Sequence, residues 1–528
     1  QEEKTYANTS YTMTDLYDNE LPISDLAINY KENAEGADIW RVQGAFFRLN
    51  YDYRSKYLLE VNGRYDGSSK YAKDDRWAFF PSASIGWRIS EEKFFEPLSK
   101  VVDNLKLRAS VGALGNQITN GYHDYMSILS GKVLTNYMMD GKMVNALNIP
   151  SLPSVVTWEK VVTKDLGLDW SLFNNRLQTT FEWYQRRTEG MLAPGADFSA
   201  EIGAAAPRMN AADLRNRGWE WSISWREQRG DWRYNISFNI YDSKTIIEKY
   251  DNAACSLPSD AMPYYEGMTL GERWGYVTDG FYEINDFVPS SDDVKGWQDG
   301  VWTLREGITS IQGITVRPGD VKFKNLRDDE NSVNRIDPGA STVDNPGDQK
   351  IIGNTSARFQ FGSSLGFGYK GFDFSMLLQG TGKRDVWLLD QSIYKPFGGV
   401  KHGALYKGHS DYWKPRDMNA NTVEGWTSVN DNPKYPRIYD NLGNQGSNFR
   451  TQTHFLENGA YLRVKNITVG YTFPTAWVSK VGLTKAKIYF SGENLFTFSS
   501  LPTGFDPERL SWSYPFYRTL SFGFNLTL

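Results

Sequence analysis

The chain has 528 residues, of which 40% are hydrophobic and 15% aromatic, and it carries a formal net charge of −5 at pH 7. No apolar run reaches the roughly 18 residues that a membrane-spanning helix needs, and the small negative charge gives no electrostatic basis for nucleic-acid binding. The single cysteine, Cys255, excludes a disulfide framework, and the four histidines show no metal-ligand spacing.

Apolar and polar residues alternate in many segments, which is the pattern of a half-buried β-strand. The expected strands, in chain order, are 40–53, 57–66, 79–90, 104–114, 157–170, 176–188, 217–226, 231–242, 356–369, 372–382, 459–473, 485–495 and 515–528. These are about 13 strands, and each is close to or longer than the ~9–11 residues that cross a bilayer when tilted. The sequence therefore predicts an all-β fold.

The two faces of these strands differ in chemistry. In 231–242, Trp232 and Tyr234 share one face, and Arg233 and Asn235 share the other. Strands that cross lipid satisfy their backbone groups through neighbouring strands, which forces closure into a barrel. We therefore predict a transmembrane antiparallel β-barrel. A large soluble sandwich or propeller would alternate too, but a propeller repeats every ~40–50 residues and no such period occurs.

The connections alternate strictly between short and long. The short ones are 54–56, 91–103, 171–175, 228–230, 370–371 and 474–484. The long ones are 67–78, 115–156, 189–213, 243–355, 383–458 and 496–514. Outer-membrane barrels have short periplasmic turns and long extracellular loops. We expect the long connections to lie outside the cell.

Counting back from a last strand that ends in the periplasm places 1–39 in an extracellular loop and leaves an odd number of strands. Bacterial single-chain barrels have even strand numbers. We therefore expect 40–528 to be the C-terminal portion of a barrel that a further odd set of strands completes.

Several blocks of the sequence carry a family resemblance. They are 66–95 (DGSSKYAKDDRWAFFPSASIGWRISEEKFF), 105–117 (LKLRASVGALGNQ), 158–192, 318–326 (PGDVKFKNL), 457–474 (ENGAYLRVKNITVGYTFP), 487–499 (KIYFSGENLFTFS), 504–508 (GFDPE) and the closing YRTLSFGFNLTL. These blocks resemble the SusC/RagA-type TonB-dependent outer-membrane transporters of Bacteroidetes, and they follow one another in the same order as in that family. The resemblance implies a barrel of roughly 22 strands, so about nine strands, a plug domain and a TonB box would belong to an N-terminal remainder.

The resemblance also implies a function and partners. The expected function is TonB-dependent import of oligosaccharides or oligopeptides across the bacterial outer membrane. The expected partners are outer-membrane lipid, a SusD-like surface lipoprotein that acts as a lid, and the TonB complex. A passive porin-like channel and a soluble glycan-binding β-protein remain the alternatives.

One departure from the family concerns metal binding. The block after Pro318-Gly319-Asp320 often reads D-x-N-x-D-G in the family, which is a calcium-loop pattern. In this chain Arg327 and Glu330 replace the expected Asn and Gly, and without Gly the sharp turn is lost. Weak candidate ligands remain at Asp328, Asp329 and Asn331.

No motif indicates an enzyme or a cofactor site. The GxGxxG letters at 366–371 precede a strand pattern rather than a helix, and no GxSxG elbow occurs. Binding is expected instead from aromatic side chains of the two largest loops, whose faces accept sugars or peptide side chains. The candidate residues are Trp274, Tyr276, Tyr282, Trp387, Tyr412, Trp413 and Trp426.

Overall fold

The computed structural model describes much of the chain at residue level. The described residues are 6–12, 29–35, 40–117, 125, 132–148, 156–194, 208–252, 255–259, 263–288, 302–311, 313–328, 335–388, 406–417, 423–439, 447–510 and 516–528.

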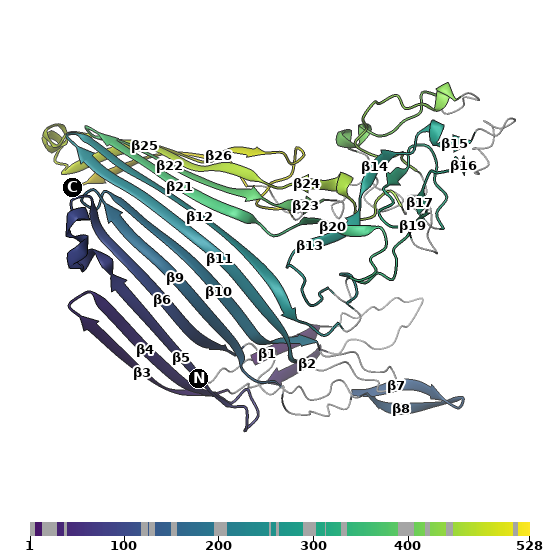
Figure 1. The fold of residues 1–528 in the computed structure, drawn as a ribbon, viewed down its shortest axis with the longest axis horizontal. Coiled ribbons are helices and arrows are strands. Elements are labelled where there is room, and N and C mark those ends of the chain that lie inside the picture. Colours follow the sequence, from purple (N-terminus) through teal and green to yellow (C-terminus); the bar gives the residue numbers. More distant parts are fainter. Residues whose placement is uncertain are drawn as a thin grey trace. The chain divides into compact units, whose positions relative to one another are not determined.

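A 13-stranded sheet dominates the fold (Figure 1). Its strands are β3 (Val42–Tyr53), β4 (Tyr57–Ser68), β5 (Trp77–Arg88), β6 (Val102–Asn116), β9 (Glu159–Leu172), β10 (Leu177–Pro194), β11 (Arg208–Arg229), β12 (Trp232–Lys249), β21 (Arg358–Tyr369), β22 (Phe372–Lys383), β25 (Tyr461–Thr472), β26 (Lys485–Ser499) and β27 (Thr519–Thr527). Each strand lies between its predecessor and its successor, so the sheet is a meander of the 13 segments that the alternation predicts. The all-β prediction is confirmed.

The remaining elements lie in the connections. Short strands there are β1 (Tyr6–Thr12), β2 (Asn29–Glu35), β7 (Lys132–Met139), β8 (Lys142–Asn148), β13 (Glu272–Tyr276), β14 (Thr278–Phe281), β15 (Phe287–Val288), β16 (Thr303–Leu304), β17 (Ser310–Ile311), β18 (Val321–Phe323), β19 (Arg335–Ile336), β20 (Gln349–Asn354), β23 (Asp385–Trp387) and β24 (Leu456–Asn458). The helices are η1 (Ile89–Glu91), η2 (Lys93–Leu98), η4 (Ile284–Asp286), η7 (Lys407–Ser410), η8 (Glu424–Trp426), η10 (Thr453–Phe455), α1 (Thr475–Val478) and η11 (Ser479–Val481). Among the described residues, no helix has the length and apolar character of a membrane span.

Contacts divide the chain into two compact units, 1–88 with 108–166 and 185–215, and 89–107 with 167–184 and 216–528. In the first unit, β3, β4 and β5 pair without a bulge from Tyr53↔Tyr57 to Gly67↔Trp77. Phe80 of β5 forms a buried cluster with Tyr71, Val156 and Trp158. The Trp158 indole N–H donates to the Arg76 carbonyl at 3.0 Å, which fastens the long connection to the sheet.

In the second unit, the register places large apolar side chains opposite one another on one face. Phe367 pairs with Phe374, and Phe490 pairs with Phe522. Phe522 is 73% exposed, so these rings point outward rather than into a second layer. Bulky apolar side chains directed away from the protein suit contact with lipid.

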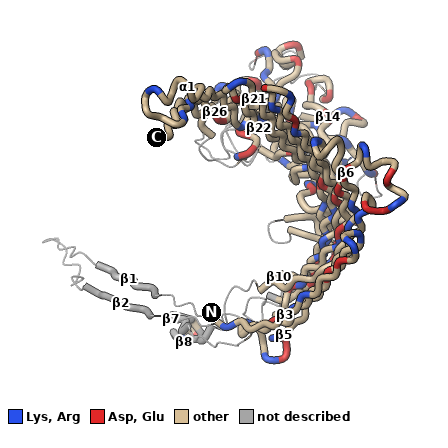
Figure 2. Tube along the Cα trace, turned by 90° about the vertical axis from the view of Figure 1, so that its left-hand side faces the viewer, with Lys and Arg blue, Asp and Glu red and all other residues tan. Residues whose placement is uncertain are grey.

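The opposite face of the same strands is polar. Ser491 pairs with Ser521, and the Lys487 ammonium donates to Asp373 at 2.8 Å. Lys, Arg, Asp and Glu occur interspersed along the described trace (Figure 2). A face with paired serines and a Lys–Asp pair suits the water-filled interior of a barrel.

Candidate ligand-binding loops and cavity

The long connections after β12 and β22 fold against each other. We call their described residues, within 250–357 and 384–460, the loop assembly. The Tyr276 amide donates to the Thr451 carbonyl at 2.9 Å, and the Thr278 hydroxyl donates to Gln452 Oε1 at 2.9 Å. The Val321 amide donates to buried Asn448 at 2.8 Å. Segments more than 120 residues apart are therefore held as one packed body.

Three of the predicted ligand-binding aromatics lie in the core of this loop assembly. Trp413 and Trp426 have no exposed surface, and both pack with Ile284. The Trp413 indole N–H donates to Glu283 at 3.3 Å. Tyr282 donates to the Thr309 carbonyl at 2.5 Å, and burial raises the pKa of its hydroxyl. In this structure these rings support the loops from inside.

The other four predicted aromatics are divided between two places. Tyr412 and Trp387 pack against a buried cluster that includes Phe455, and the Arg273 guanidinium lies 5.6 Å from the centroid of the Trp387 ring. Trp274 and Tyr276 line a cavity instead. Ligand contact by any of the seven stays a prediction.

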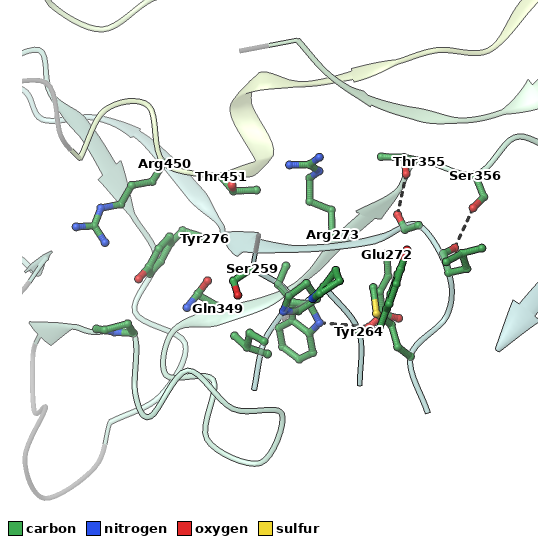
Figure 3. Close-up of a pocket in the computed structure, with 18 residues that line it drawn as sticks. Ser259, Tyr264, Glu272, Arg273, Tyr276, Gln349, Thr355, Ser356, Arg450 and Thr451 are labelled. Atoms are coloured by element: carbon green, nitrogen blue, oxygen red, sulfur yellow. Dashed lines mark hydrogen bonds between the residues drawn. The ribbon is translucent and has the colours of Figure 1, made fainter. Parts of the chain in front are cut away.

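The cavity has a volume of about 780 Å³, within the range of ligand pockets. β13 and β20 form one wall, and the segments around 257–264, 338, 355–356 and 450–451 complete it. In Figure 3, Arg450 and Tyr276 lie at one end and Ser356 at the other. The cavity is therefore elongated and draws its walls from both loops.

Glu272 is the acidic side chain of the cavity wall, and its oxygens are already engaged. It accepts hydrogen bonds from the Tyr265 hydroxyl, from the Thr269 amide at 3.0 Å and from the Trp274 indole N–H at 3.3 Å. Burial and the bond to Glu272 together raise the pKa of Tyr265, so this phenol stays protonated. The group fixes the wall rather than presenting a free carboxylate.

Arg450 supplies positive charge at the other end. Its guanidinium carbon lies 6.0 Å from the centroid of the Tyr276 ring, a cation–π contact. Tyr276 is 4% exposed, and burial raises the pKa of its hydroxyl while Arg450 opposes that rise. The carboxylates of Asp348 and Asp337 also raise the pKa of the Tyr276 hydroxyl.

Asp320, in the Pro318-Gly319-Asp320 block, is a buried hydrogen-bond acceptor within the loop assembly. It is 2% exposed and accepts hydrogen bonds from the Tyr439 hydroxyl and the Asn448 amide, both at 2.8 Å. The Arg317 amide donates to its second oxygen at 2.8 Å. Burial raises the pKa of Asp320 despite these bonds. The sequence of this block resembles the family but does not by itself indicate a role for Asp320.

The weak calcium candidates fall largely outside the described residues. Asp329 and Asn331 are not described, and Asp328 accepts a hydrogen bond from the Asn325 side chain at 2.6 Å. Within the described part of the chain, no group of three or more His, Cys, Asp or Glu side chains is arranged to hold a metal ion. Calcium binding at these three residues stays a prediction.

A two-faced antiparallel meander with long loops on alternate connections defines a class, the wall of an outer-membrane β-barrel. The chain belongs to the family described as "TonB dependent receptor-like, beta-barrel", whose sequence profile matches residues 2–495. The predicted barrel fold and outer-membrane location are confirmed on this basis.

Named relatives support the same family. TonB-dependent receptor P3 of Formosa agariphila is 27% identical over 91% of this chain and 45% of its own length. TonB-dependent receptor SusC of Bacteroides thetaiotaomicron is 26% identical over 92% of this chain and 43% of its own length. The chain thus spans under half the length of these relatives.

Solved structures confirm the fold. The RagAB peptide transporter structure matches with a TM-score of 0.66 at 20% identity, covering 92% of this chain and 46% of the compared chain. The RagAB peptide importer in its "closed-closed" state matches with a TM-score of 0.68 at 20% identity, covering 97% and 50%. The SusC/RagA-type resemblance seen in the sequence is therefore confirmed.

Proposed function

We propose that this chain provides barrel wall and outer loops for a TonB-dependent transporter that imports oligopeptides or oligosaccharides. Residues 40–528 form the wall with its loops, and 1–39 belong to an extracellular loop. A SusD-like surface lipoprotein caps the loops, and a plug with about nine further strands completes the transporter. The TonB complex supplies energy from the inner membrane.

The observation that carries the proposal is that the sheet has one apolar face directed outward and one polar face, in a chain that matches the family profile. The paired rings of Phe490 and Phe522 suit lipid, and the paired hydroxyls of Ser491 and Ser521 suit a water-filled passage. The loop assembly adds a cavity where cargo can be held before passage. Similarity to the RagAB peptide transporter structure supports the peptide class.

The two alternatives differ in their support. Family membership leaves the soluble glycan-binding alternative without support. A passive porin-like channel shares the barrel wall but not the need for energy. Energy dependence is therefore the property that separates it from the proposed transporter.

Uptake by whole cells tests the proposal. The gene that encodes this chain is deleted and restored in its own bacterium, and cells receive a labelled oligopeptide mixture or labelled oligosaccharides too large for porins. Uptake of one cargo class should fall to background on deletion, return on complementation, and stop when a protonophore removes the proton gradient. Uptake that persists with the protonophore would identify a passive pore, and uptake unchanged by deletion would refute the proposal.

A further inference from the structure

The cavity of the loop assembly has an uneven charge balance. Its wall carries one carboxylate, Glu272, which three donors already engage. Nearby Asp348 is fully buried and accepts from the backbone amides of Leu326, Arg327 and Asp337. Asp337 accepts from the Gly339 amide, and both Asp348 and Asp337 raise the pKa of the Tyr276 hydroxyl, which Arg450 lowers. These carboxylates are thus held by backbone amides, and the Arg450 guanidinium can meet a further negative group at this end of the cavity.

The other polar side chains do not compete for that role. The hydroxyls of Thr355 and Ser356 donate to the Gly271 and Leu270 carbonyls at 3.1 and 2.9 Å. Arg273 packs on Trp387, and in Figure 3 its side chain points away from Tyr264 and Gln349. Arg450 and Arg273 are the two arginines of the lining, and Arg450 is the one beside Tyr276. An arginine fork suits a planar carboxylate.

The lining also contains apolar side chains. They are those of Leu257, Pro258, Pro263, Met268, Leu270 and Pro338. Such a surface takes up apolar side chains, whereas sugars present hydroxyl groups that need hydrogen-bonding partners when they are buried. Gln349, which lies near Tyr276 and Ser259 in Figure 3, can bond a peptide backbone group.

We propose that this cavity binds a short apolar peptide segment with its carboxylate against Arg450. The carboxylate is either the C-terminus of the peptide or an acidic side chain within it. This inference rests on the proposed import function for its biological role, and it selects peptide over glycan as the cargo that the loops retain. The aliphatic wall holds the side chains next to the carboxylate.

Binding to the purified, full-length transporter in detergent tests the inference. The probes are a fluorescent Leu-Pro-Val-Leu peptide with a free C-terminal carboxylate, its C-terminal amide, and an amidated version with an internal glutamate. Maltoheptaose and oligogalacturonate represent neutral and acidic glycans. We expect the free acid or the glutamate peptide to bind at least tenfold more tightly than the plain amide, because a charge-assisted hydrogen bond is lost with the carboxylate.

Variants assign the effect to Arg450. Arg450→Met keeps the length of the side chain over Tyr276 but should lower affinity for the acidic peptide about tenfold or more, with no effect on the amide. Arg450→Lys should lose less, because it keeps the charge without the fork. Arg335→Met is the matched control, since Arg335 belongs to the same loop assembly, is exposed and lies outside the cavity wall. Heat-modifiable migration on gels confirms that each variant barrel folds.

The outcomes separate this inference from the proposed function. The inference would be overturned if neither the free acid nor the glutamate peptide bound more tightly than the plain amide, or if no peptide bound. Tighter binding of oligogalacturonate, or an Arg450→Met effect matched by Arg335→Met, would also overturn it. Energised uptake together with any of these results would leave the transport proposal standing. Peptide binding that depends on Arg450, without energised uptake, would support the inference and refute the transport proposal.

Discussion

Replacement of Arg463 by methionine should release the loop that joins β26 to β27. Arg463 lies on β25, is 2% exposed, and donates to Asp506 at 2.7 Å and to Thr497 Oγ1 at 2.9 Å. A Glu508 carboxylate oxygen lies 3.2 Å from a second guanidinium nitrogen of Arg463, so these two side chains form an ion pair. Methionine fills a similar length but makes none of these polar contacts.

The structure sets the size of the effect. Breaking a buried ion pair by removing one partner costs about 3–5 kcal/mol, because it leaves a charge without compensation. The side chains of Asp506 and Glu508 are each 13% exposed. Lys465, which the substitution leaves in place, donates to Glu508 at 2.9 Å. Water and Lys465 therefore offset part of the loss. We expect about 3 kcal/mol, which is roughly a hundredfold change in the local opening equilibrium.

Amide hydrogen exchange of peptides that cover 500–510, measured on the purified protein in detergent, reads this opening directly. Lys465→Met is the control, because Lys465 is 23% exposed and should cost only about 1 kcal/mol or less. Exchange in the Arg463→Met variant that stays within a few-fold of wild type, or equals that of Lys465→Met, would refute the reasoning.

Three further predictions concern the loops and the wall. Burial raises the pKa of Asp320 above its ordinary value of 3.8, so the folded loops favour the protonated carboxyl. The stability of the wild-type loops should therefore fall as the pH rises from below 3.8 through the raised pKa of Asp320. Amide hydrogen exchange between about pH 3 and 7 should show this pH dependence in the wild type and not in Asp320→Asn. Gly319 has φ of +90°, and an added Cβ would lie 2.4 Å from the Trp413 ring. Gly319→Ala should therefore destabilise the loop assembly by about 2–4 kcal/mol, seen as altered tryptophan fluorescence and faster exchange. Phe490→Arg should reduce barrel stability in lipid by about 2–4 kcal/mol, measured by urea titration of refolded protein, and Ser491→Arg on the polar face should cost much less.

Most of the wall was predictable because alternation is a local signal. A strand with lipid on one side and water on the other shows its two faces in consecutive residues. The ends of strands were less predictable. The pattern predicts 217–226, but β11 extends over Arg208–Arg229. Part of this extension is tied by Asp213, which accepts from the Gly190 amide at 2.8 Å, and a local pattern contains no sign of that contact.

The loops were predictable in composition but not in burial. Aromatic content identified Trp274 and Trp413 together, yet Trp274 lines the cavity and Trp413 is fully buried. What distinguishes them is a partner distant in sequence, such as Glu283, which accepts the Trp413 indole N–H from 130 residues away. Irregular segments have no fixed period, so no spacing of residues indicates which ring points inward.

Arg450 was missed for the same reason, and its position has a consequence for specificity. It comes from one loop and Tyr276 from the other, so the cationic end exists only once both loops have packed. The packing itself depends on other residues, among them Asp320 and Asn448, which are buried and do not line the cavity. Tyr276 belongs to both the lining and a buried cluster of the loop core, whereas Arg450 belongs to the lining and to no buried cluster named above. Substitutions at Arg450 can change which cargo is retained while the barrel and the loop core stay intact, which is how one scaffold accommodates different ligands.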